Sequence, residues 1–160
     1  MKEVLSNYII NQQTLALIPF NEYPYQAIVY EGERKIYVKQ KPLDIIKTTC
    51  LEFFTSYTGI REAVQHKVGI DRKIPLPISP HQNIYTFPTL SPENQDCTWL
   101  FYNHIHRITP ITFSFKNPYQ SIITFQNGIE LSLDISHYIL EKQMYRMGMC
   151  VKRFQEAVFS

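Results

Sequence analysis

Short turns join the β-rich segments of this chain, and this feature limits its possible folds most strongly. Residues 123–131, ITFQNGIEL, place Asn127-Gly128 between alternating runs, a pattern typical of a two-residue hairpin. Residues 26–39, QAIVYEGERKIYVK, place Glu31-Gly32-Glu33 between two β-rich runs in the same way. NYIINQQTLALI, residues 7–18, alternates more loosely and turns at residues 11–13. Connections this short predict antiparallel strands, because parallel neighbours need a long crossover.

Two segments have the apolar spacing of helices instead. A helix is predicted from Pro42, because the following apolar residues recur every three or four positions until Gly59 breaks the pattern: Leu43, Ile46, Cys50, Phe53 and Tyr57. IREAVQHKV, residues 60–68, predicts a second short helix that ends at Gly69. The segment 136–158 predicts a C-terminal helix with one apolar stripe, formed by Leu140, Met144, Met147, Val151, Phe154 and Val158.

The segment 71–92 contains five prolines, at positions 75 to 92. Proline cannot donate to a central sheet ladder, so we expect a rigid, extended surface segment with at most a short edge strand at residues 83–87. Further strands are expected at WLFYNHIHRI, ITFSF, SIITF and IELSL. The order β, α, β, α predicts an α+β fold in one domain over residues 1–160. It consists of an antiparallel sheet built from hairpins, a central helix–turn–helix-like pair and a C-terminal helix packed on the sheet.

Charge is unevenly distributed along the chain. Residues 34–73 carry nine Lys or Arg against four Asp or Glu, a net charge of +5, whereas residues 1–33 carry −3. Solvated surfaces usually intersperse the two signs, so a block of this kind favours one face that binds a polyanion. Simple surface decoration is the alternative, and the charge pattern alone leaves it open.

Composition and the N-terminal segment exclude several classes of protein. Apolar residues make up 44% of the chain, which is typical of a globular protein. We expect no membrane-spanning helix, because no apolar run approaches 18 residues. The start MKEVLSNYIINQQ lacks a signal core, and three cysteines form no disulfide framework, so a cytoplasmic location is expected.

The sequence offers little for enzymatic chemistry. It contains no phosphate-binding loop, Gly-x-Ser-x-Gly elbow, His-Glu-x-x-His or Cys-x-x-Cys. His104 and His106 would point the same way on one strand and could supply half a metal site. Cys97 would lie on the opposite strand face, which makes a shared site geometrically poor. We therefore favour a strand with one packed aromatic face and the histidines at its polar end, and expect neither an enzyme nor a cofactor.

The basic block instead suggests nucleic-acid binding. Helix–turn–helix geometry would place residues 60–68 in a major groove, with Arg61, Gln65 and Lys67 near base edges. A second basic patch is possible on the C-terminal helix, at Arg146, Lys152 and Arg153. Two short helices with a turn are also a common packing unit, so both interpretations remain open at this point.

Several motifs together resemble the ComK family of competence transcription factors. They are residues 54–59, the Phe87–Pro92 block FPTLSP, Cys97-x-Trp99 and His104-Ile105-His106, within a similarity from about residue 7 to residue 157. The resemblance implies a cytoplasmic, sequence-specific DNA-binding activator of DNA-uptake genes that recognises paired A/T-rich boxes, contacts the minor groove and binds as a multimer. It also implies that the histidine stretch is a structural strand, with Trp99 in the core and without an enzymatic role.

Minor-groove recognition of A·T pairs favours Arg and Lys side chains that reach into a narrow, negative groove. We therefore predict that the helix pair is a scaffold for cations rather than a major-groove reader. The predicted DNA-binding residues are Lys39, Lys41, Arg61, Lys67, Arg72, Lys73 and Arg107.

Two departures from the family pattern affect these expectations. Ile60 stands where the family commonly has Arg, and Arg61 follows, about 100° further round a helix. Longer members also continue beyond the final helix into a tail read by a protease adaptor, so adaptor-dependent turnover is not carried over. The chain resembles a short form. A second hypothesis follows: a non-activating paralogue that co-assembles with a full-length ComK relative through its terminal helix.

Overall fold

Seven strands of the protein form one mixed sheet. In the computed structural model, which describes residues 2–112 and 114–159, this sheet has the order β1-β4-β3-β2-β7-β6-β5. Its strands are β1 Glu3–Leu5, β2 Thr14–Glu22, β3 Tyr25–Glu31, β4 Arg34–Val38, β5 Leu76–Ser79, β6 Ile84–Pro88 and β7 Trp99–Phe101. All neighbours pair antiparallel except β1 and β4, which are parallel. The predicted hairpin at Gly32 joins β3 to β4, with Gly32 at a φ of 58°.

A second, three-stranded sheet has the order β10-β9-β8. Its strands are β8 Ile105–Pro110, β9 Ser121–Phe125 and β10 Glu130–Leu133, all antiparallel. The hairpin predicted at Asn127-Gly128 joins β9 to β10, and Gly128 takes the positive φ of 89° that this turn requires. The predicted fold class, α+β with largely antiparallel sheets and a C-terminal helix, is confirmed.

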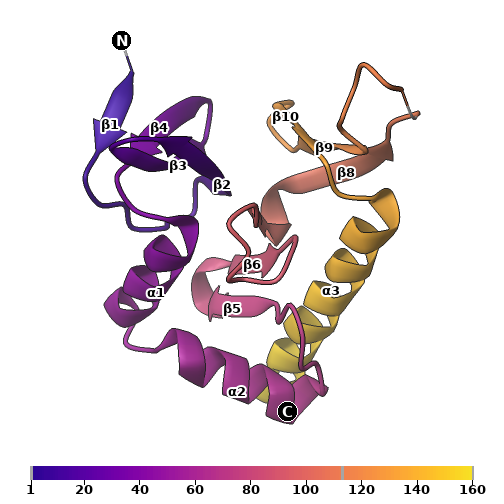
Figure 1. Ribbon diagram of the computed structural model, residues 1–160. Helices are drawn as coiled ribbons and strands as arrows, with labels where there is room; N and C mark the ends of the chain where they lie inside the picture. Colours follow the sequence, from indigo (N-terminus) through magenta and orange to yellow (C-terminus); the bar gives the residue numbers. More distant parts are fainter. Residues whose placement is uncertain (1, 113, 160) are drawn as a thin grey trace.

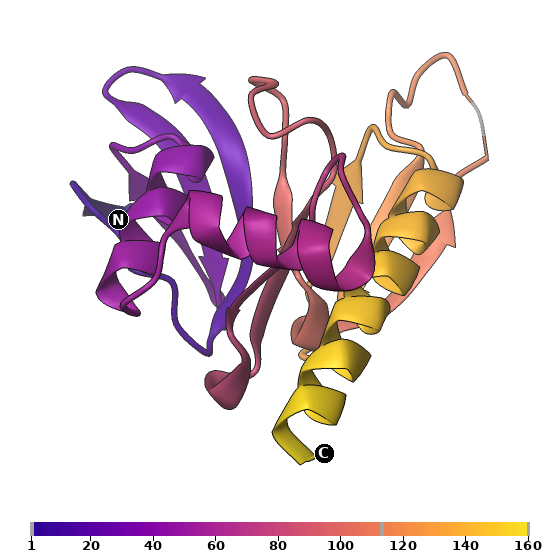
Figure 2. The same cartoon turned by 90° about the horizontal axis from the view of Figure 1, so that it is seen from below.

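Within the described residues, three α-helices cover these sheets: α1 Pro42–Glu52, α2 Tyr57–Val68 and α3 His137–Phe159. Figure 1 shows α1 descending from the N-terminal strands to a corner, where the chain turns into α2. Figure 2 shows α2 crossing from α1 toward α3. Helix α2 contacts β5 and α3, and α3 contacts β5, β6 and β8. The predicted docking of α3 is confirmed at Leu140 and Met147 of its stripe, which are fully buried, whereas Val158 at the end of the predicted stripe is 46% exposed.

The N-terminal hairpin over residues 7–18 was predicted wrongly. The turn exists, since the Thr14 N–H donates to the Asn11 carbonyl at 3.1 Å. The residues before it form no hairpin strand; β1 pairs instead with β4, and Tyr8 and Ile10 are buried. The Tyr8 hydroxyl bonds to Glu31 at 2.6 Å, so a side-chain contact replaces the expected ladder.

The boundary between the first two helices also differs from the prediction. Helix α1 ends at Glu52, and Gly59 lies inside the first turn of α2 rather than before it. Ser56 caps α2, since its hydroxyl accepts from the Gly59 N–H at 2.9 Å. The serine cap therefore determines where α2 starts, and glycine is tolerated one turn later.

The proline-rich segment is far more buried than predicted. All five residues of β6 are buried, and this strand lies inside the sheet between β7 and β5. Proline is tolerated because Pro88 ends the strand and Pro77 lies on the edge strand β5.

The strand predicted at residues 99–108 is divided between the two sheets. A short 3₁₀ turn, η2 Tyr102–His104, separates β7 from β8. Trp99 lies in the core as expected, with 1% of its surface exposed. Of the predicted strand 111–115, residue 113 lies outside the described residues, and Ser114 forms a single bridge to Asn117. Among the helices that the structure describes, none combines the length and apolarity needed to span a membrane.

Candidate nucleic-acid interface

Three of the predicted DNA-binding residues line one groove. Arg61 from α2 and Arg72 and Lys73 from the following loop face the segment 90–93, and the groove has a volume of about 530 Å³. Asp71 and Glu93 line it as well, together with Leu90, Ser91 and Pro92. Arg61 thus shares one concave surface with Arg72 and Lys73, which lie about ten positions later in the sequence.

The end of α2 sends the chain into this groove. Gly69 caps the helix in the left-handed conformation, at a φ of 79°, and its N–H donates to the Gln65 carbonyl. Lys73 also takes a positive φ, 46°, which a residue with a side chain rarely adopts without support. The loop that carries Arg72 and Lys73 is therefore held in a specific conformation by its surroundings.

Helix α3 supplies that support. Gln143 is only 1% exposed, and its amide donates to the Lys73 carbonyl at 3.0 Å and to the Pro88 carbonyl at 2.7 Å. Arg146 donates to the Gln143 side chain and to the Arg72 carbonyl. Gln143 and Arg146 of α3 therefore hydrogen-bond to the backbone carbonyls of Lys73 and Arg72, the two residues that carry the cations of the loop.

Positive charges are crowded at this place. Burial lowers the pKa of the Lys73 ammonium, and the nearby charges of Arg146 and Lys142 lower it further. Burial also lowers the pKa of Arg146. Lys142 and Arg146 of α3 lie beside the groove, close to Lys73. We use the name cation groove for Arg61, Arg72 and Lys73, which line it, together with these two neighbours. Because Lys142 and Arg146 repel the Lys73 ammonium and the five cations outnumber Asp71 and Glu93, a polyanion would relieve the repulsion.

The first turn of α2 extends the cationic surface toward α1. Lys47 of α1 and Arg61 of α2 both lie over the Tyr57 ring, with the Lys47 ammonium 5.6 Å and the Arg61 guanidinium 5.3 Å from its centre. Ile60 is buried, with 7% of its surface exposed. Arg61, the next residue, is half-buried beside the Tyr57 ring.

The other four predicted DNA-binding residues lie elsewhere in the described chain. Lys39 and Lys41 are exposed in the connection between β4 and α1, and Lys67 is exposed in the last turn of α2. Arg107 is exposed on β8, in the three-stranded sheet. The cation groove contains three of the seven predicted residues, and all seven stay predictions.

Sequence reasoning missed Gln143 and left Lys142 out of the predicted site. A signal for Gln143 was present: it lies three residues after Leu140 and four before Met147, both in the buried stripe. A polar residue at a core position of a helix usually has hydrogen-bond partners in the interior. Its partners could not be named, because Lys73 and Pro88 are far away in the sequence.

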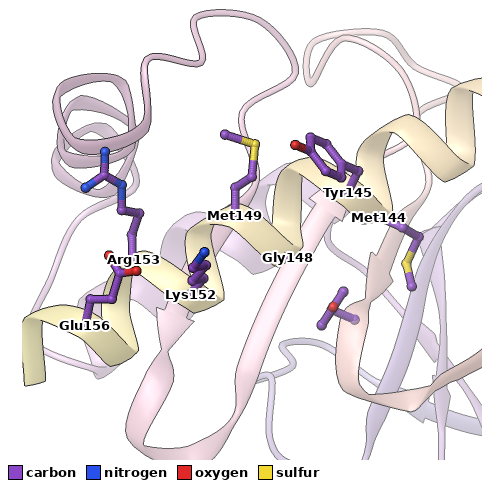
Figure 3. A pocket seen from close by; sticks show the side chains of 8 residues that line it. Met144, Tyr145, Gly148, Met149, Lys152, Arg153 and Glu156 are labelled. Carbon is purple, nitrogen blue, oxygen red and sulfur yellow. The ribbon is translucent and has the colours of Figure 1, made fainter. Parts of the chain in front are cut away.

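A second hollow runs along the exposed side of α3. It has a volume of about 690 Å³ and is lined by Tyr102, Met144, Tyr145, Gly148, Met149, Lys152, Arg153 and Glu156. Figure 3 shows Tyr145, Met149 and Arg153 projecting to one side of the helix. Lys152 and Arg153 of the predicted second basic patch lie here, whereas Arg146 belongs to the cation groove.

The two histidines that could have formed half a metal site do not share one strand. His104 lies in η2, and its Nε2 is 2.6 Å from the Gln12 carbonyl, whereas His106 is exposed on β8. Cys97 is buried, its thiol donates to the Leu90 carbonyl at 3.4 Å, and burial raises its pKa. Within the described residues, no group of three or more His, Cys, Asp or Glu is placed to hold a metal ion.

Comparison with known proteins identifies close similarity over almost the whole chain. A model of the family described as ComK protein matches residues 5–158. A competence transcription factor of Bacillus subtilis (strain 168) is 29% identical over 155 residues, which are 96% of this chain and 78% of that protein. No solved structure matches the chain.

Proposed function

The chain belongs to the ComK family, and we propose that it is a competence transcription regulator that binds double-stranded DNA at paired A/T-rich boxes. Its relative in Bacillus subtilis is a competence transcription factor. With this activity the protein would act in the cytoplasm, at the nucleoid. It would bind its DNA as an oligomer.

The cation groove is the observation that carries this proposal. Its cations come from α2, the following loop and α3. Fixed cations of this kind bind phosphates and suit the narrow, negative minor groove of A/T-rich DNA. Lys39, Lys41, Lys67 and Arg107 are then additional contacts with DNA that passes beyond the groove.

The packing of α2 supports the proposed role of this helix as a scaffold for cations. Tyr57, Ile60 and Val64 are buried along one side of α2, and its neighbours are β5 and α3. Figure 2 shows the helix lying lengthwise against the body of the molecule.

The proposal predicts salt-dependent binding that depends on the groove. The double variant Arg72→Ala/Lys73→Ala removes two phosphate partners, so its salt dependence, log Kd against log salt concentration, should be less steep by about 1–2. Fluorescence anisotropy with an A/T-box duplex over a salt series measures this change. The control is Lys35→Ala, an exposed cation on β4 whose ammonium lies over Tyr30. Wild-type protein that does not bind the duplex would contradict the proposal.

A second candidate function is supported by the exposed side of α3. Tyr145 and Met149 there are exposed beside a hollow, a combination more typical of a protein contact than of solvent. The chain would then co-assemble with a full-length ComK relative and modulate it without activating transcription. Co-purification with that relative and a silent competence reporter when the chain is expressed alone would favour this function. Reporter activation by the chain alone would exclude it.

A further inference from the structure

The turn between α1 and α2 has a geometry that normally requires glycine. The Thr55 N–H donates to the Cys50 carbonyl at 3.0 Å, and the Phe54 N–H donates to the Leu51 carbonyl at 3.2 Å. This pair of bonds is the Schellman motif, which ends a helix with one residue in the left-handed conformation. That residue is Phe54, with a φ of 60°. For a bulky side chain such a φ is an outlier.

The Phe54 side chain is not buried by the fold, so burial does not compensate for its strained backbone. Its relative exposure is 101%, and that of Leu51, in the last turn of α1, is 69%. Glycine at position 54 would remove both the strained backbone and the exposed apolar surface. A residue that is unfavourable on both counts indicates a role outside the folded chain. We call Leu51 and Phe54 the corner knob.

The surroundings of the corner knob indicate what it meets. Lys47 lies four residues before Leu51, on the same side of α1, and contacts the Tyr57 ring together with Arg61. Figure 1 shows that α1 turns into α2 at a corner of the molecule, and the corner knob belongs to this turn. Arg61 of the cation groove lies near the start of α2. Glu52 is also exposed here, but residues 34–73 as a whole carry a net charge of +5. An apolar projection within a cationic surface fits DNA.

We propose that Phe54 is a wedge that inserts between two stacked base pairs of the bound duplex from the minor groove, with Leu51 beside it. The inference rests on the proposed DNA binding and adds the residue that distorts the DNA. Phe and Leu are side chains that minor-groove proteins insert in this way, and the flexible TA steps of A/T-rich boxes open most easily. The backbone strain holds the ring outward before DNA arrives.

The test compares wild-type protein with F54G on an A/T-box duplex in which 2-aminopurine replaces an adenine at a TA step. Wild-type protein should raise the 2-aminopurine fluorescence, because unstacking removes its quenching. F54G should bind about tenfold more weakly, as expected for one lost stacking contact, and leave the fluorescence unchanged. F54G should also melt about 2–4 °C higher, since glycine suits the turn. F54L, which keeps an apolar projection, should retain most of the fluorescence rise.

Tyr119→Ala provides the matched control, because Tyr119 is an exposed aromatic residue, 46% exposed, in the segment before β9. It should leave affinity and fluorescence unchanged. Equal affinity and equal fluorescence for wild-type protein and F54G would overturn the wedge and leave DNA binding intact. If F54G loses self-association in sedimentation while wild-type protein causes no fluorescence rise, the knob is a contact between copies, which also overturns the wedge. Wild-type protein that does not bind the duplex removes both proposals.

Discussion

Gln143 shows how one buried amide can organise a surface site. Its side chain joins three segments: the loop at Lys73, the end of β6 at Pro88, and α3 through Arg146. Without Gln143, the carbonyls of Lys73 and Pro88 would lose this donor in a buried or half-buried environment. The conformation of the cationic loop therefore depends on a residue that itself carries no charge.

Replacing Gln143 with Leu should destabilise the protein by about 1–3 kcal/mol, because buried carbonyls lose their donor. It should also weaken DNA binding at temperatures where the variant is fully folded, since the Lys73 loop is no longer held. Urea unfolding and fluorescence anisotropy measure the two effects. Gln155→Leu makes the same change at an exposed position of α3 and should alter neither. A destabilised variant with wild-type DNA affinity would contradict the positioning role.

At the scale of elements, the helix pair owes its shape to two caps. A Schellman motif with Phe54 ends α1, and the Ser56 side chain begins α2 two residues later. Gly59 leaves room for this cap, since a Cβ at that position would come within 2.8 Å of the Ser56 hydroxyl oxygen. The direction of α2, and with it the place of Arg61, follows from these local bonds.

Ser56→Ala should lower the free energy of unfolding by about 1 kcal/mol, the usual contribution of a serine N-cap. The measurement is urea unfolding followed by circular dichroism. Thr58→Ala, an exposed change in the first turn of α2, serves as the control and should have a smaller effect. If the two variants are equally stable, the capping bond does not determine the start of α2.

At the scale of the whole molecule, α3 connects the two sheets. It contacts β5 and β6 of the seven-stranded sheet and β8 of the three-stranded sheet. The described segment between β7 and β8 passes from one sheet to the other within three residues. The sheets should therefore unfold together, in line with the expectation of one domain.

Leu140→Ala, at a fully buried position of α3, tests this coupling. The substitution should cost about 2–5 kcal/mol, as large-to-small changes in a core do. Fluorescence of Trp99 reports on the seven-stranded sheet, and hydrogen exchange of β8–β10 reports on the other. Both should shift by the same free energy. Loss of protection in β8–β10 with an unchanged Trp99 transition would show that the sheets are separate units.

Local sequence patterns were sufficient to predict the features that depend on neighbouring residues. Local turn chemistry and side-chain periodicity predicted the Glu31-Gly32-Glu33 and Asn127-Gly128 hairpins, the helix starting at Pro42, the Gly69 cap, and the buried positions Leu140 and Met147 of α3. These signals act over a few residues, so they can be read without knowing the fold.

The contacts between distant segments became known only from the folded structure. It placed β6 inside the sheet, paired β1 with β4, divided residues 99–108 between two sheets, and brought Gln143 beneath Lys73. Each of these depends on contacts between residues far apart in the sequence. Local sequence patterns do not reveal the free energy of such contacts. Arg61, Arg72 and Lys73 were visible as part of a basic block, but their gathering at one surface required the loop after α2 to pack against α3.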